Sequence, residues 1–211
     1  YYWKVIGISL CFIIPILVLI FVFKFFIAGL LLLLYILFLA PFIDTPMGQL
    51  KGTLVYHSPL FITQKSGNNK LILHGGTLFD YVFTIDKSLN GQERKKFIIL
   101  GYLRGLLSLI NAYETGIMTD QSLKGTSYII NERTATKIGF KKVPVDGVQY
   151  IILAFNYFTL MAAYSVANAK LSFPKLSEVK TFEASLSELA ERKGFIKDLE
   201  KFLSNSLSKK L

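Results

Sequence analysis

Two apolar stretches dominate the start of this chain: VIGISLCFIIPILVLIFVF (Val5–Phe23) and FFIAGLLLLLYILFLAPFI (Phe25–Ile43), separated only by Lys24. Each stretch approaches the ~20 apolar residues that a helix needs to cross a bilayer. One continuous helix through both would be far too long for the hydrocarbon core. The sequence therefore predicts an N-terminal transmembrane helical hairpin over residues 1–43, with the amine of Lys24 reaching the headgroups near its turn.

The composition changes behind these stretches. Of the 24 basic and 14 acidic residues, 22 basic and 13 acidic residues lie after residue 44, so this part carries a net charge of +9. A basic surface beside a bilayer gains about 1 kcal/mol per well-placed lysine or arginine from anionic lipids. The expected partners are the lipid bilayer and its anionic headgroups, and nucleic acid is not expected, because the anchor already holds the domain near lipid.

The charges around the hairpin predict its orientation. Lys4 precedes the first apolar stretch, and the basic region follows the second. A hairpin places both on the same side, and positively charged flanks favour the cytoplasm. We therefore expect an integral membrane protein whose main domain is cytoplasmic, and a membrane-protein partner is a further expected interaction.

Cysteine usage and the known short motifs limit the chemistry. Cys11 is the only cysteine and lies within the first apolar stretch, so the chain can form neither an internal disulfide nor a cysteine-based zinc site. No P-loop, dinucleotide-binding fingerprint or EF-hand loop is present. The sequence predicts no cofactor and no metal site.

The region after the hairpin begins with patterns typical of strands. Gln49–Thr63 reads as extended, with Pro59 restricting it to an edge or a bend. A polar turn separates it from Lys70–His74, which predicts a β-hairpin. Leu78–Ile85 is rich in aromatic and β-branched residues and is predicted to be a buried strand.

Helical and extended patterns alternate farther along the chain. The predicted elements are a helix over Gly91–Tyr113, a strand over Thr126–Ile130, a helix over Glu132–Ile138 closed by Gly139, and an extended Phe140–Val145. Together with the preceding strands, they predict a basic, membrane-proximal α+β domain over residues 44–173. Its architecture would be a small mixed sheet with packed helices.

Val148–Ala169 is a further apolar region of 22 residues without charge. This length is sufficient for a third transmembrane helix. Its polar side chains, such as Gln149 and Asn156, favour the alternative of a buried helix or one that lies at an interface.

Residues 174–211 predict amphipathic C-terminal helices behind Pro174, with a break at Gly194. The apolar stripe consists of Phe182, Leu186, Leu189, Ile196, Leu199 and Leu203. We expect the stripe to pack on the domain, and a partner helix is the alternative.

His74 and Asp80 are the candidate catalytic residues, at the two ends of the segment HGGTLFD. Paired glycines let backbone N–H groups approach a ligand, and a histidine with an aspartate can transfer a proton. A glycine-enabled bend with a half-buried histidine is the alternative interpretation.

Two segments are similar to acyltransferase motifs. The segment from His74 to Asp80 is similar to the signature of glycerolipid acyltransferases, in which four residues separate a histidine from an aspartate. Here five residues separate them, which turns the carboxylate away from the histidine. Gly125–Phe140 is similar to the last motif of GNAT-type acetyltransferases, although Asp86–Arg94 lacks that family's glycine pattern for coenzyme A.

Four further residues are candidates for binding. Asn131, Glu132 and Arg133 follow a predicted strand end, where α/β folds tend to place ligands, and they could orient a polar headgroup. Capping and a surface ion pair are the alternative. Arg104 is a cation in an apolar stretch, and we expect it to bind an anion or to pair with Asp80 or Glu114.

These features lead to two hypotheses of function. The first is a membrane-anchored subunit or scaffold that acts at the cytoplasmic bilayer surface. The alternative is a membrane-bound transferase or hydrolase that acts on an acyl or lipid-linked substrate, with His74 and Asp80 as the acid–base pair and Arg104 or Arg133 holding an anion.

Overall fold

The computed structural model describes residues 2–67 and 69–208, without the side chains of residues 2–6, 8, 37, 38, 41 and 42. The chain forms two compact units, Tyr1–Gly52 and Thr53–Leu211. The side chain of Lys4, on which the predicted orientation partly depends, lies outside the described part.

The first unit contains two helices joined by a short turn, α1 (Tyr2–Phe21) and α2 (Ala28–Leu50). The helices pack together, and the rings of Phe12 and Tyr35 stack with their centroids 5.6 Å apart. Lys24 lies in the turn with a left-handed φ of 57°.

Hydropathy does not identify a membrane span in this unit. Within the described ranges, no single helix is both long and apolar enough to cross a bilayer. The described apolar stretch of α1, Ser9–Phe21, is shorter than the ~20 residues that a crossing requires. The transmembrane hairpin predicted for residues 1–43 is therefore not shown by the structure.

The second unit is a mixed α/β domain built on a six-stranded sheet in the order β1-β2-β3-β4-β6-β5, within the part of the chain that the structure describes. The strands are β1 (Leu54–Ser58), β2 (Phe61–Lys65), β3 (Lys70–Gly75), β4 (Ser122–Ser127), β5 (Lys141–Val143) and β6 (Lys180–Ser185). Strands β3 and β4 pair in parallel, and the other neighbours are antiparallel. The predicted mixed sheet with packed helices is confirmed.

The first three strands form two hairpins. The pairing of β2 with β3 confirms the predicted hairpin, and Gly67 takes a φ of 76° in its turn. The predicted single extended segment is two strands instead, because the chain reverses at Pro59 and Leu60. Proline lacks the N–H that a continuous strand would need there.

The crossover between β3 and β4 contains α3 (Leu78–Thr84) and α4 (Gly91–Glu114). The strand predicted for Leu78–Ile85 is wrong, since this segment is helical. Thr77 and Asp80 form a capping box that satisfies free N–H groups at the start of α3, and this local bonding outweighs the β propensity of the aromatic residues. Helix α4 is confirmed, with Asn90 as its N-cap.

The main core lies between the sheet and α4, α8 (Leu186–Glu191) and α9 (Lys193–Ser208). The predicted stripe packs on the domain, as expected, and Leu186, Leu189, Ile196 and Leu203 are buried in this core. Lys180–Ser185 was predicted to be helical and forms strand β6 instead. Pairing along both of its edges, with β4 and β5, outweighs the helical spacing of Phe182 with Leu186.

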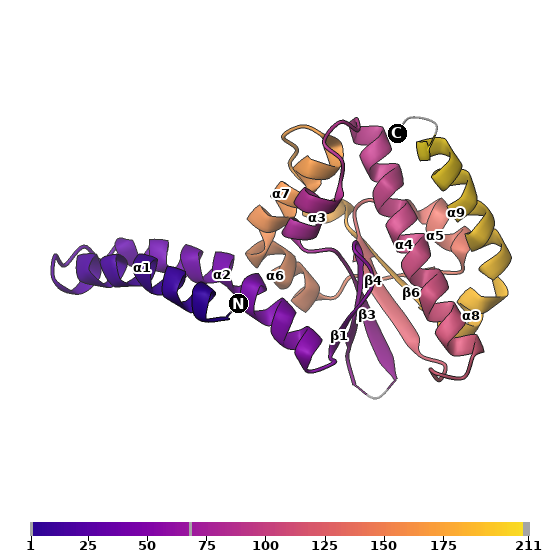
Figure 1. The fold of residues 1–211 in the computed structure, drawn as a ribbon, viewed down its shortest axis with the longest axis horizontal. Coiled ribbons are helices and arrows are strands. Elements are labelled where there is room, and N and C mark those ends of the chain that lie inside the picture. Colours follow the sequence, from indigo (N-terminus) through magenta and orange to yellow (C-terminus); the bar gives the residue numbers. More distant parts are fainter. Residues whose placement is uncertain (1, 68, 209–211) are drawn as a thin grey trace. The chain divides into compact units, whose positions relative to one another are not determined.

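The remaining helices are α5 (Glu132–Ile138), α6 (Gly147–Phe155) and α7 (Tyr157–Asn168), followed by the short η1 (Leu176–Glu178). In Figure 1, α3, α6 and α7 lie together on the other side of the sheet from α5, α8 and α9. Helix α5 is confirmed with its predicted bounds, and Gly139 ends it with a φ of 115°.

The uncharged region is not one helix. Helices α6 and α7 meet at Asn156 with a bend of 76°, and together they have the length and hydropathy of a membrane span. The side chain of Asn156 donates to the carbonyl of Ile152 at 2.9 Å. Such local side-chain bonds compete with the helix backbone and favour a break.

Candidate functional site

The parallel strands β3 and β4 end side by side at one edge of the sheet. Leu73 pairs with Gly125, so that Gly75 and Ser127 lie at matching ends. Helix α3 follows the first strand, and α5 follows the second. Because α/β folds bind ligands outside the carboxyl ends of parallel strands, this edge is the candidate functional site.

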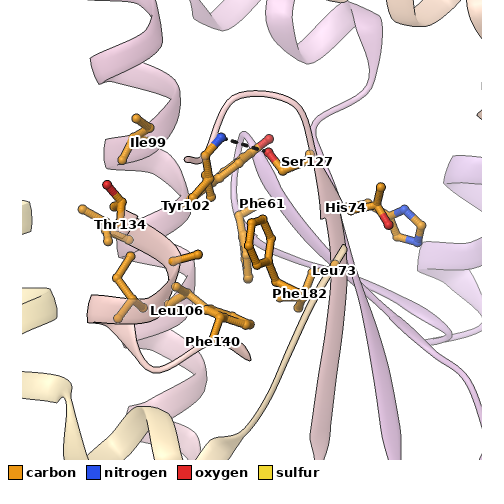
Figure 2. Close-up of a pocket in the computed structure, with 17 residues that line it drawn as sticks. Phe61, Leu73, His74, Ile99, Tyr102, Leu106, Ser127, Thr134, Phe140 and Phe182 are labelled. Atoms are coloured by element: carbon orange, nitrogen blue, oxygen red, sulfur yellow. Dashed lines mark hydrogen bonds between the residues drawn. The ribbon is translucent and has the colours of Figure 1, made fainter. Parts of the chain in front are cut away.

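A cavity of about 60 Å³ lies at this edge, between the sheet, α4 and α5. Its wall is formed largely by apolar side chains, among them Phe61, Leu73, Ile99, Leu103, Leu106, Ile130, Ile138, Phe140 and Phe182. Figure 2 shows Phe61, Phe182, Leu106 and Phe140 gathered around the space. Apolar cavities tend to remain dry and to accept apolar groups, so this one suits a small hydrocarbon group.

Tyrosine hydroxyls gather beside the last residue of β3. The hydroxyls of Tyr81 and Tyr102 are 3.2 Å apart, and Tyr81 also interacts with the hydroxyl of Tyr128. A Cβ atom at Gly75 would lie 2.8 Å from Oη of Tyr102 and 3.1 Å from Oη of Tyr81. Glycine is therefore required for the backbone to approach these hydroxyls so closely.

The tyrosine hydroxyls are protonated at neutral pH. Burial raises the pKa values of Tyr81, Tyr102 and Tyr128 above their usual value of 10.0, because a phenolate would lose its hydration. Of the three, Tyr102 lines the cavity, and its hydroxyl is bonded to that of Tyr81. The protonated hydroxyls are unsuited to act as bases.

His74 lies at the end of β3 and its ring points away from the cavity (Figure 2). Its Nε2 lies 3.0 Å from Oε1 of Gln64 on the neighbouring strand β2. One part of the imidazole is exposed, and desolvation by the protein around the rest lowers the pKa of His74 below 6.5. The imidazole is therefore mainly neutral at pH 7.

The carboxylate of Asp80 accepts hydrogen bonds from the start of its own helix and from a neighbouring strand. Its Oδ2 accepts from the backbone N of Thr77 at 2.6 Å and from the hydroxyl of Thr77 at 2.8 Å. Tyr56 of β1 donates to the same oxygen at 3.0 Å. No hydrogen bond joins Asp80 to His74 among the residues described, and their acid–base pairing remains a prediction.

Arg104 forms an ion pair, although not with either predicted partner. Its Nε donates to Oε1 of Glu200 on α9 at 2.8 Å. Asp80 is bound as described above, and Glu114 pairs with Lys193. The guanidinium lies on the outer side of α4, where it links two helices and does not reach the cavity.

The segment Asn131–Arg133 starts α5. The side chain of Asn131 caps the helix by accepting from the N of Thr134 at 2.8 Å. Glu132 accepts from Lys142 at 3.1 Å and Lys180 at 3.4 Å, and the hydrogen bond from Lys142 is the main cause that lowers the pKa of Glu132. These contacts agree with the alternative interpretation of this segment, in which Asn131 caps the helix and Glu132 forms a surface ion pair.

Arg133 lines a shallow groove between α5 and α9. The other residues that line this groove are Glu132, Thr136, Lys137, Arg192 and Phe195. Among the described side chains, no carboxylate forms an ion pair with Arg133, Lys137 or Arg192. With three basic side chains and one carboxylate, which is already paired with Lys142 and Lys180, the groove is net positively charged.

The sequence analysis did not identify the cavity or the tyrosine hydroxyls. Tyr81, Tyr102 and Tyr128 come from α3, α4 and the loop after β4, and no spacing in the sequence connects them. The one local signal was the Gly75-Gly76 pair, since close backbone approach is a usual reason for glycine.

The described residues contain no cluster of three or more histidine, cysteine, aspartate or glutamate side chains that could hold a metal ion. The cavity at this edge offers mainly apolar contact, and Tyr102 is among the residues that line it. Comparison of the chain with protein-family models, curated proteins and solved structures gives no significant match.

Proposed function

We propose that this protein is a membrane-anchored subunit or scaffold that acts at the cytoplasmic bilayer surface. The observation that carries the proposal is the exposure of large apolar side chains along α1, the turn and α2. They include Leu10, Phe12, Ile14, Phe21, Phe23, Phe25, Phe26, Leu30, Leu31, Leu34 and Ile36. Exposed apolar surface on this scale needs a covering of lipid or protein.

In this proposal, α1 and α2 form a hairpin in the bilayer. Lys24 in the turn extends its amine toward the headgroups, and the positively charged remainder of the chain stays in the cytoplasm. Both ends of a hairpin leave the bilayer on the same side, so the second unit remains next to the membrane surface.

The basic groove supports electrostatic docking of the domain on anionic headgroups. Arg133, Lys137 and Arg192 would each contribute about 1 kcal/mol close to the surface of an anionic membrane. A protein partner in the membrane is part of the same proposal, and its identity is left to co-purification.

Vesicle flotation after an alkaline carbonate wash tests the anchor. We expect the full chain to remain with the vesicles. Leu34→Arg places a charge in the middle of the second apolar stretch, at a cost of about 3 kcal/mol in a bilayer. Leu34→Arg should weaken retention on the vesicles more than the control Leu50→Arg at the end of α2. The anchor would be contradicted if the two variants were retained equally, or if the wash removed both.

The apolar cavity favours a second candidate function, a membrane-bound transferase or hydrolase for an acyl or lipid-linked substrate. A small cavity at the carboxyl ends of β3 and β4 could accept the end of an apolar group. His74→Ala distinguishes the two candidates in an assay of acyl-ester hydrolysis by the full chain in vesicles. An enzyme that uses His74 loses activity while its fold and flotation are unchanged, and a scaffold has no activity to lose.

A further inference from the structure

Helix α6 lies almost entirely outside the core. Within α6, all of whose residues the structure describes, none is buried. Its apolar side chains Val148, Tyr150, Ile151, Ile152 and Phe155 are exposed, and Phe158 continues this surface into α7. A helix of this composition in water leaves more apolar area exposed than a stable surface element usually does.

A second exposed segment follows α7. Leu171 and Phe173 are 71% and 63% exposed, and Lys170 and Lys175 stand on either side of them. The segment is held in place, since the hydroxyl of Ser165 accepts from the N of Ser172 at 3.0 Å. The exposure of these two apolar side chains therefore results from the packing of this loop on α7.

Helix η1 connects the two surfaces. Helix η1 follows the loop and packs against α6, so the chain returns from the end of α7 to the exposed helix. Figure 1 shows α6 and α7 on the same side of the sheet. We call α6 with Phe158, Leu171 and Phe173 the apolar ridge.

The charge pattern identifies the kind of partner. No charged residue lies between Gly147 and Ala169, and Lys170 follows directly. The other charges at the border are paired: Asp146 lies 3.8 Å from Lys124, and Lys175 lies 3.0 Å from Glu178. Lipid suits this surface because the uncharged pair of α6 and α7 has the hydropathy of a membrane segment, and Lys170 beside it is attracted to anionic headgroups. A protein interface usually has a polar rim, whereas α6 carries no charged residue.

The bend decides how the ridge meets the bilayer. A straight spanning helix has about 20 continuous residues, and the 76° bend at Asn156 interrupts this pair. A nine-residue α6 can instead lie parallel to the membrane with its side chains among the acyl chains.

We infer that the apolar ridge inserts into the headgroup–acyl boundary of an anionic bilayer and gives the second unit a membrane contact of its own. This inference rests on the proposed function in one respect, that the chain works at a bilayer. It adds a contact that does not depend on α1 and α2.

The experiment uses the full chain in vesicles that contain brominated lipid, which quenches tryptophan at the depth of the acyl chains. Trp3, the only tryptophan, is first replaced by phenylalanine. Phe155→Trp then reports on the ridge. Phe202→Trp on α9 is the matched control, because Phe155 and Phe202 are equally exposed, at 66% each.

We expect brominated lipid to reduce the emission of Phe155→Trp several-fold and to leave that of Phe202→Trp nearly unchanged. Lys170→Glu with Lys175→Glu should reduce the quenching in anionic vesicles, whereas Lys197→Glu with Lys201→Glu on α9 should not.

Equal quenching of the two tryptophans, or none in either, overturns the inference. A blue-shifted Phe155→Trp emission that bromine does not quench also overturns it, because protein then covers the ridge. Flotation of the same samples tests the proposed anchor separately. If the chains float but the tryptophan in the ridge is not quenched, the anchor is supported and only the ridge inference is contradicted.

Discussion

The hydroxyl of Tyr56 donates to Oδ2 of Asp80 at 3.0 Å, which connects β1 to the first turn of α3. The same carboxylate closes the capping box with Thr77. Asp80 therefore joins β1 to the start of α3, and its removal should first affect folding.

We predict that Asp80→Ala lowers the free energy of unfolding by about 2 kcal/mol, since the cap is lost and the Tyr56 hydroxyl loses its acceptor. Urea unfolding of the full chain in detergent measures the change. Asp198→Ala, at an exposed position of α9, is the matched control and should behave like the wild type. If the Asp80→Ala protein were as stable as the wild type, the structural role of Asp80 would be contradicted.

The contact between α4 and β2 depends on a missing side chain at Gly105. A Cβ atom there would lie 2.2 Å from Cδ1 of Phe61. Gly105→Ala should therefore destabilise the domain by about 1–3 kcal/mol through overpacking. Gly194→Ala on α9 has open space around the new methyl group and should be neutral or slightly stabilising.

Shortening the side chain of Phe61 tests whether its contact with residue 105 causes the destabilisation. If the contact with Phe61 is responsible, Phe61→Leu should cost less in the Gly105→Ala protein than in the wild type. Additive effects of the two substitutions would place the cause elsewhere.

Arg94 ties the start of α4 to α7. Its guanidinium donates to three backbone carbonyls: Leu89 at 2.8 Å, Val166 at 2.9 Å and Lys87 at 2.7 Å. A lysine cannot reproduce this planar set, so Arg94→Lys should lower stability by about 1–2 kcal/mol. Hydrogen exchange should become faster at the end of α7, and unchanged protection there would show that the contacts are dispensable. Lys95→Arg is the control.

The two histidines predict a loss of stability on mild acidification. Burial lowers the pKa values of His57 and His74 below 6.5. A histidine whose pKa is depressed on folding contributes its full stability above pH 6.5, and this contribution falls as the pH drops toward the folded-state pKa. The wild-type midpoint in urea should therefore decrease between about pH 7.5 and pH 5.5.

His57→Gln with His74→Gln should flatten this dependence. The carboxyl groups of Asp86, Glu132 and Glu188 have lowered pKa values and titrate below the same window. A wild-type decrease that persists in the double variant would assign the effect to other groups.

Local signals in the sequence predicted several elements well. Glu132–Ile138 was found with its bounds because Asn131 caps its start and Gly139 ends it. The strand prediction for Leu78–Ile85 failed because composition was given more weight than the Thr77–Asp80 capping box. The break at Asn156 was missed because its hydrogen bond to Ile152 becomes apparent only once the helix has formed.

The candidate site could be predicted only in part. The Gly75-Gly76 pair lies at the edge of the sheet that carries the cavity, and His74 and Asp80 lie on the elements beside it. The partners of these residues depend on tertiary packing: Tyr56 comes from β1, and Glu200, which binds Arg104, comes from α9. Contacts between such distant segments have no signature in a single sequence.

The central claim, that α1 and α2 lie within a bilayer, is tested most directly at Cys11, the only cysteine of the chain and exposed on α1. N-ethylmaleimide reacts with the thiolate, which does not form in hydrocarbon. In vesicles, we predict that Cys11 remains unlabelled until denaturing detergent is added, whereas Asn205→Cys on α9, in a Cys11→Ser chain, is labelled throughout. Equal labelling rates for the two positions in intact vesicles would contradict the membrane anchor.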